Sequence, residues 1–219
     1  VTLRPTAILN LDNSLNANIY FQSDLTGSAQ LADATGGSIN GIATVERHIA
    51  LGNRAFRFLA SPVNTTESIN QNWQEGENNI GLNYPEDNKN STPGYGTHIS
   101  GSSTGNNGFD ATTTGNYSLF TFDNSHNGIQ DNAWTPILST NTNNLLVGIP
   151  YLTYIRGDRS INLNNNNAIH TSTTLRASGD IYIGSKTPNL NTIDAYYSLV
   201  ANPYQSIVDF NSLNFGGDI

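Results

Sequence analysis

The feature that most limits the fold is the apolar run at residues 145–163 (LLVGIPYLTYIRGDRSINL), the densest in a polar chain. Pro150 has no N–H to donate to a β-ladder, so we expect a core strand to start there. Gly157-Asp158 suits a two-residue turn, from which residues 159–163 would return as a second strand. The run therefore predicts a buried β-hairpin around which the rest of the chain packs.

The remainder of the 219 residues is rich in Asn, Thr, Ser and Gly and only 12% charged. The charged fraction is about half that of an average globular domain, so polar uncharged side chains must keep the chain in solution. Such side chains bond to nearby backbone and compete with helix formation. Short alternating apolar runs recur along the whole chain, which favours an all-β fold and argues against disorder.

The alternation divides the chain into two predicted parts. Residues 1–40 read as short solenoid-like β-rungs, and edge strands of a sandwich explain the same residues equally well. Residues 41–219 are predicted to form a β-sandwich or jelly-roll-like domain. Its expected strands are 42–50, 55–63, 93–101, 108–111, 116–123, 134–138, 150–155, 159–163, 171–177, 180–183, 196–201 and 207–210.

Three details of this second part can be compared with a structure. A short helix is expected at residues 64–72, capped by Thr65 or Thr66, with Ile69 and Trp73 on its buried face. The strand at 55–63 is expected to bury its apolar residues while Arg57 points the other way. The strands at 171–177 and 180–183 are expected to pair around a turn at Ser178-Gly179.

Charge and composition exclude several classes of function. The net charge is −8 and only two lysines, Lys89 and Lys186, are present. Nucleic acid and anionic membrane both require a cationic surface, so neither is an expected partner. No apolar run reaches the ~18 residues that a bilayer span needs. The absence of Cys excludes disulfides and thiol chemistry. Because the chain also lacks Met, we expect a processed or internal piece of a longer protein. The chain stops after Gly216-Gly217 without a clear closing element, so we also expect the natural protein to continue.

Several phrases follow one another in a characteristic order from residue 41 onward. They are residues 45–49 (VERHI), 56–63 (FRFLASPV), 72–76 (NWQEG), 93–101 (PGYGTHISG), 108–110 (GFD), 148–159 (GIPYLTYIRGDR), 174–179 (TLRASG) and 198–210 (SLVANPYQSIVDF). Together they resemble a β-rich region of large secreted surface proteins of Bacteroidota-type bacteria. The resemblance covers roughly residues 41–213 and implies an exported, extracellular or cell-surface location. It also implies the type IX secretion machinery as a partner, although the sorting domain of those proteins is absent here.

The tripeptide Arg156-Gly157-Asp158 spells the sequence that integrins recognise. Three-residue matches arise readily by chance, and Gly157 is the residue that a turn with positive φ requires. Arg156 and Asp158 can form local ion pairs or bond loop carbonyls. We interpret the tripeptide as a structural turn.

Two further patterns suit ligands. Asp123, Ser125, Asn127 and Asp131 offer alternating oxygen ligands of the kind that Ca²⁺ prefers, and an ordinary Asn/Asp turn explains them as well. The aromatic residues Trp73, Trp134 and Tyr95 predict a stacking platform for carbohydrate, with burial in a β core as the alternative.

Catalytic signatures are weak. Glu75, Glu77 and Asp110 would suit glycoside hydrolysis only if two carboxylates faced each other at the required separation. The four histidines show no metal-ligand spacing, and no G-x-S-x-G phrase occurs. The sequence therefore predicts a non-enzymatic structural or adhesive module without a cofactor, unless calcium binds. Its β faces would pack, and its edge strands would pair, with other modules or copies of itself, residues 1–11 being the expected donated strand. The alternative prediction is a carbohydrate-binding module.

Overall fold

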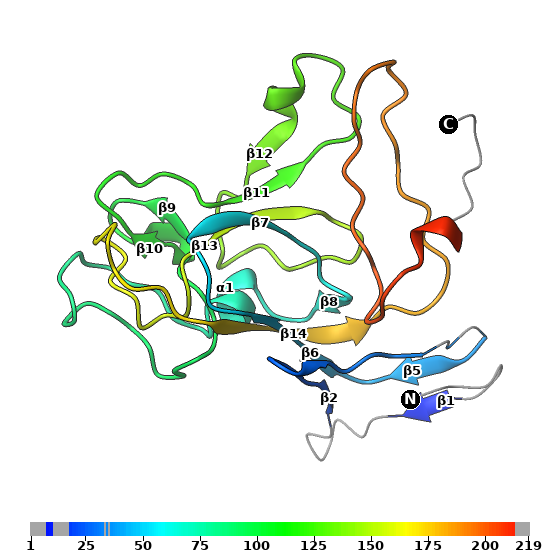
Figure 1. Ribbon diagram of the computed structural model, residues 1–219, viewed down its shortest axis with the longest axis horizontal. Helices are drawn as coiled ribbons and strands as arrows, with labels where there is room; N and C mark the ends of the chain where they lie inside the picture. The colour runs from blue at the N-terminus through cyan, green and yellow to red at the C-terminus, as the bar shows by residue number, and fades with distance from the viewer. Residues whose placement is uncertain (1–7, 11–17, 33, 35, 213–219) are drawn as a thin grey trace.

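The computed structural model describes residues 8–10, 18–32, 34 and 36–212, and it is mainly β. Two four-stranded sheets dominate, with strand orders β12-β11-β13-β7 and β2-β6-β14-β8 (Figure 1). The strands are β1 (Ile8–Asn10), β2 (Ile19–Phe21), β3 (Ser23–Asp24), β4 (Gly27–Ser28), β5 (Ser38–Asn40), β6 (Ala43–Ile49), β7 (Ala55–Leu59), β8 (Val63–Thr65), β9 (Ser100–Ser102), β10 (Asp110–Ala111), β11 (Leu119–Phe122), β12 (Trp134–Pro136), β13 (Tyr151–Ile155) and β14 (Thr173–Ile181).

The described residues contain little helix. The helices in these ranges are α1 (Ile69–Trp73) and the 3-10 helices η2 (Asn106–Gly108), η3 (Gln130–Ala133) and η4 (Phe210–Ser212). None of them has the length and apolar character needed to cross a membrane. The expectation of a mainly β chain is confirmed for the part that the structure describes, and α1 is the one short α-helix in that part.

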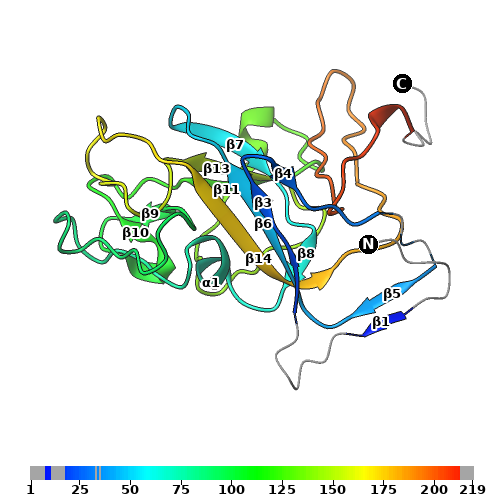
Figure 2. The same cartoon turned by 60° about the horizontal axis from the view of Figure 1, so that its bottom comes forward.

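The core lies between the two sheets (Figures 1 and 2). The β12-β11-β13-β7 sheet contributes Leu119, Tyr151 and Ile155, while the β2-β6-β14-β8 sheet contributes Val45 and Leu175. Burying these side chains supplies the main driving force for folding, at roughly 25 cal/mol per Å² of apolar surface.

Helix α1 fills the end of this core. Ile69 and Trp73 are buried one helical turn apart, as the sequence predicted. The predicted cap is wrong: the N-cap is Ser68, whose Oγ accepts a hydrogen bond from Gln71 N. Thr65 instead lies in β8, where its hydroxyl accepts a hydrogen bond from Leu145 N.

Strand β13 is central to its sheet, because β7 and β11 pair with its two edges. No edge of β13 is left for residues 159–163, so the predicted return strand is wrong. The segment forms a turn instead, and Arg159 points into the protein with none of its surface exposed.

Strand β14 runs without interruption for nine residues, so the predicted turn at Ser178-Gly179 is wrong. Gly179 lies opposite Thr65 of β8, where a Cβ atom would come 1.9 Å from Asn64 O. The glycine is therefore needed for the close approach of two strands, not for a bend.

Strand β7 also differs from the prediction. Phe56 and Phe58 are 49% and 64% exposed, whereas Arg57 is half-buried on the opposite face. Alternation was read correctly, but the wrong face was assigned to the core.

Two predicted strands near the C-terminus are absent from the described residues, at 196–201 and 207–210. Side-chain amides take the place of a ladder there: Asn124 Oδ1 accepts from Leu199 N, and Gln130 Oε1 accepts from Tyr197 N. The predicted strand at 93–101 begins only at Ser100, as β9, which pairs with β10.

The described part of residues 1–40 shows no solenoid. Strand β1 pairs in parallel with β5, and β2 pairs in parallel with β6. Phe21 of β2 lies in the same core cluster as both sheets. Of the predicted donated strand at residues 1–11, only Ile8–Asn10 falls within the described residues.

Candidate functional site

One face of the β12-β11-β13-β7 sheet is rich in aromatic side chains. Cross-strand register places Phe58 beside Leu152 and Leu152 beside Phe120, while Tyr154 lies beside Phe56. Residues opposite one another in a sheet share a face. We call this surface the aromatic face, made of Phe56, Phe58, Phe120, Trp134 and Tyr154.

The rings of the aromatic face contact one another across all four strands. Phe56 lies edge-on to Tyr154 at 5.0 Å and to Phe120 at 6.2 Å between ring centroids. Phe58 stacks with Trp134 at 6.1 Å. Phe56 and Phe58 are the most exposed of the five, so about half or more of each side chain remains open to solvent.

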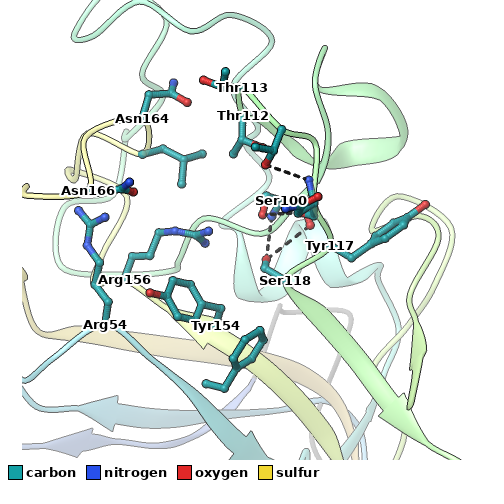
Figure 3. Close-up of a pocket in the computed structure, with 14 residues that line it drawn as sticks. Arg54, Ser100, Thr112, Thr113, Tyr117, Ser118, Tyr154, Arg156, Asn164 and Asn166 are labelled. Atoms are coloured by element: carbon teal, nitrogen blue, oxygen red, sulfur yellow. Dashed lines mark hydrogen bonds between the residues drawn. The ribbon is translucent and has the colours of Figure 1, made fainter. Parts of the chain in front are cut away.

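A cavity of about 400 Å³ opens at the Phe56–Tyr154 end of the aromatic face. Its wall combines aromatic rings, two arginines, and hydroxyl and amide groups (Figure 3). The lining residues are Arg54, Phe56, Ser100, Thr112, Thr113, Thr114, Asn116, Tyr117, Ser118, Tyr154, Arg156, Leu163, Asn164 and Asn166. We refer to this cavity as the arginine pocket.

The two arginines give the pocket its charge. The Arg156 guanidinium lies 4.6 Å from the centre of the Tyr154 ring, and Figure 3 shows it extending into the pocket. Arg54 Nη2 donates to Asn165 O at 2.9 Å and to Ala168 O at 3.4 Å. Among the described residues that line the pocket, none is Asp or Glu.

Burial is the main reason that the pKa of Arg156 falls to about 10; Tyr154 opposes the shift and the charge of Arg54 adds to it. The guanidinium therefore stays protonated at neutral pH. Its Nη1 atom is buried and has no hydrogen-bond partner among the described residues, and the same holds for Arg54 Nε. Both atoms are donors without an acceptor.

A separate charged cluster lies inside the protein. Asp110 Oδ1 accepts from Arg159 Nη2 at 2.8 Å and from Asn79 N at 2.8 Å. Asp110 Oδ2 accepts from Arg159 Nη1 at 3.1 Å and from Ile99 N at 3.0 Å. His98 Nδ1 lies 3.2 Å from Asp110 Oδ1, and the side chains of all three residues are essentially inaccessible.

Burial favours the neutral form of Asp110, but the charges of His98 and Arg159 and their hydrogen bonds outweigh it. The pKa of Asp110 is therefore held well below its usual range. Because no solvent reaches the carboxylate, this cluster has the character of a structural centre.

The carboxylates considered for glycoside hydrolysis each face an arginine. Glu75 pairs with Arg176, and Glu77 Oε2 lies 3.8 Å from Arg159 Nε. Asp110 is fully buried, as described above. The structure does not bring two of these carboxylates together across an open cleft.

The aromatic residues predicted from the sequence occupy three different environments. Trp73 is buried in the core, edge-on to Tyr151 at 5.4 Å. Tyr95 lies under the Arg176 guanidinium at 4.3 Å. Only Trp134 belongs to the aromatic face.

The predicted calcium ligands lie in or next to a turn in which the Asp123 carboxylate already accepts hydrogen bonds from the turn itself. Asp123 Oδ1 accepts from Ser125 N at 2.8 Å and from Ser125 Oγ at 2.6 Å, and these bonds lower the pKa of Asp123. Asn127 is exposed in this turn and Asp131 lies in η3. In the described ranges, no group of three or more His, Cys, Asp or Glu side chains is placed to hold a metal.

The Arg156-Gly157-Asp158 segment forms a buried turn. Gly157 has φ of 128°, and Asp158 is 5% exposed. The Asp158 carboxylate accepts from Gly94 N at 2.7 Å and from Thr171 Oγ1 at 2.8 Å, and it also bonds Ser160. These contacts hold Asp158 inside the turn, and no pattern in the sequence indicated that Arg156 enters a pocket.

Sequence reasoning missed Arg54, Phe56 and Phe58 as well as the role of Arg156. The alternation of residues 55–59 (AFRFL) was the available signal, because it places both phenylalanines on one face. Comparisons of the chain with protein-family models, with curated proteins and with solved structures found no match.

Proposed function

We propose that this protein is a non-catalytic module that binds polysaccharide at the aromatic face. The observation that carries the proposal is the exposure of Phe56 and Phe58 beside Trp134 on one side of a sheet. Exposed apolar surface of this kind costs solubility and usually marks a binding site. Phe58 and Trp134 come from the two outermost strands of the sheet and still stack at 6.1 Å, so the rings form one continuous cluster.

The chemistry around the rings favours a sugar over an apolar partner. A sugar has C–H faces that pack on aromatic rings and hydroxyl groups that need hydrogen-bond partners. The arginine pocket continues the surface with hydroxyl and amide groups. Ligand sites typically combine such ring surfaces with a few polar groups.

We place this activity in an adhesive module of an exported bacterial surface protein. The two sheets would form a sandwich-like unit, and export would follow the type IX route. The support for this setting is the resemblance of residues 41–213 to secreted surface proteins, together with a net charge of −8.

A second candidate is assembly through strand pairing. Strand β7 is at the edge of its sheet and carries the two exposed phenylalanines. Long exposed edges with apolar side chains are templates for pairing with another chain. Self-association would then depend on the same residues as sugar binding, so the two candidates need one common set of variants.

The test measures binding of the purified protein to galactan, laminarin and polygalacturonate by affinity electrophoresis and calorimetry. Phe58→Ala and Trp134→Ala should each weaken binding by about 5-fold or more, since an aromatic contact contributes about 1 kcal/mol beyond its area. Tyr20→Ala is the matched control, because Tyr20 is 56% exposed on the other sheet.

Thermal unfolding of each variant checks that the fold is retained. Absence of binding to all three polymers, or equal binding by wild type and both variants, would contradict the proposal. Concentration-dependent self-association that is lost in Phe58→Ala, without polysaccharide binding, would instead support assembly through β7.

A further inference from the structure

We propose that the arginine pocket holds the anionic group of an acidic sugar, with Arg156 and Arg54 as its cationic partners. The inference rests on the proposed function, because it assigns the pocket to a residue of the same polysaccharide chain. The shared chemistry is an oxyanion on a sugar ring, either a uronate carboxylate or a sulfate ester.

The first argument is charge. The chain has 17 acidic and 9 basic residues, yet this pocket contains two guanidinium groups and, among its described lining residues, no carboxylate. Leaving a charged group desolvated and unpaired is costly. An anion in the pocket would remove that cost.

The second argument is hydrogen bonding. Arg156 Nη1 and Arg54 Nε are buried donors with no acceptor among the described residues. A carboxylate or sulfate presents several acceptor oxygens, and guanidinium groups bind such oxyanions through short charge-assisted hydrogen bonds. The Tyr154 ring already fixes the Arg156 guanidinium from one side at 4.6 Å.

The third argument is continuity with the aromatic face. Phe56 and Tyr154 belong both to that face and to the wall of the arginine pocket, with ring centroids 5.0 Å apart. A polysaccharide stacked on the aromatic face would therefore have one of its sugar units inside the arginine pocket. The cavity of about 400 Å³ falls in the size range of sites for small organic ligands.

The fourth argument separates a sugar acid from a bare anion. Ser, Thr and Asn side chains make up most of the remaining wall, and Figure 3 shows Thr113 and Asn164 across the pocket from the arginines. Hydroxyl and amide groups both donate and accept hydrogen bonds, as the hydroxyls of a sugar ring require. A simple anion site would need donors only.

The experiment compares each acidic polysaccharide with its uncharged counterpart. Wild type is titrated with polygalacturonate, its methyl ester, dextran sulfate and dextran, at low and at moderate salt. At least one of the two acidic polymers should bind to wild type. Arg156→Gln and Arg54→Gln should each reduce the affinity for that polymer about 10- to 100-fold, as expected for loss of a charged hydrogen bond. They should leave binding of the uncharged counterpart unchanged.

Arg47→Gln is the matched control, because Arg47 is an exposed arginine on the other sheet. Binding of polygalacturonate without dextran sulfate identifies a carboxylate, and the reverse identifies a sulfate ester; either supports the proposal. Thermal unfolding of both pocket variants shows whether they are folded. If Arg156→Gln does not fold, the affinity of Arg54→Gln for the acidic polymer tests the proposal.

Three outcomes would overturn the inference, each with a different meaning for the proposed function. If charged and uncharged polymers bind equally and depend on Phe58 but not on Arg156, the pocket assignment fails while sugar binding stands. If no polymer binds, both fail. If polyglutamate binds with the same dependence on Arg156 and no saccharide does, the pocket serves acidic peptides.

Discussion

Contacts from several parts of the chain converge on the Asp110 carboxylate. This carboxylate accepts from Arg159, from the backbone of Asn79 and Ile99, and from Gln74 Nε2. These partners come from four segments that contain little regular structure. A buried ion pair adds little net stability over an apolar pair, but loss of one partner leaves an uncompensated charge. The Asp110–Arg159 pair therefore favours the one arrangement of these segments in which both buried charges are paired.

We expect Asp110→Asn to lower the free energy of unfolding by about 3–5 kcal/mol at pH 7, because Arg159 loses its counter-charge. The pKa of Asp110 is lowered in the folded state. Its stabilising contribution is therefore present above the unfolded value of about 4 and is lost as the pH falls below it. The difference between wild type and variant should shrink on acidification from pH 4 to pH 2, by up to about 1.4 kcal/mol per pH unit.

Urea unfolding across this pH range measures the effect. Asp180→Asn is the matched control, since Asp180 is an exposed carboxylate in β14. A pH-independent difference between wild type and Asp110→Asn would show that folding does not lower the pKa of Asp110.

At the scale of elements, close approach between strands decides where glycine is needed. Gly179 lies in the middle of β14, and a Cβ atom there would meet Asn64 O, Asn64 C and Thr65 Cα of β8 at 1.9–2.7 Å. All three atoms belong to backbone, so no side-chain rotation can relieve the clash. Strand β8 must move if any side chain is added.

Gly179→Ala should therefore lower the free energy of unfolding by about 3 kcal/mol, at the upper end of the range for overpacking. Gly52→Ala is the matched control. Its Cβ would lie 3.5 Å from Arg57 Nη2 and its backbone has no positive φ, so the change should stay within about 1 kcal/mol. Chemical denaturation of both variants makes the comparison. Equal stability of the two would show that β14 and β8 are not in tight contact.

These elements also show what a sequence can predict. Strands β6, β11, β12 and β13 and the helix face of Ile69 and Trp73 were identified, because periodicity reports local structure. Periodicity does not say which face of β7 meets the core, since alternation fits both orientations. It also cannot tell a glycine in a turn from one under a neighbouring strand, as at Gly179.

The candidate site was largely beyond sequence reasoning for a related reason. Arg159 and Asp110 are 49 positions apart, and their pairing depends on how the loops fold. Arg54 and Arg156 meet only because β7 and β13 are neighbours in the sheet. Trp134 was identified as a surface aromatic residue by its type alone, and the same reasoning selected Trp73, which is in the core.

For the whole molecule, one core links residues that the sequence assigned to two parts. Phe21 is 3% exposed and belongs to the cluster that both four-stranded sheets share. Strand β2 continues the sheet of β6, β14 and β8. Side chains in one cluster gain or lose their packing together, which favours a single cooperative transition.

Phe21→Ala should lower the stability of the entire domain by about 3–5 kcal/mol, the usual cost of truncating a buried phenylalanine. The fluorescence of the two tryptophans, Trp73 and Trp134, both far from residue 21 in sequence, should report the shift at the same denaturant concentration as circular dichroism. Tyr20→Ala serves as the control, because this neighbouring side chain is 56% exposed. A tryptophan transition unaffected by Phe21→Ala would mean that the first segment folds separately.

The buried Arg156-Gly157-Asp158 turn bears on how any cell-adhesion assay of this protein would be read. A receptor that reads this tripeptide needs the aspartate carboxylate, and in the folded chain that group is bonded to Gly94, Thr171 and Ser160. Denatured or proteolysed material would present the same three residues freely. Cell attachment to surfaces coated with this protein would then measure damage to the preparation, so a conformation check must accompany every such assay.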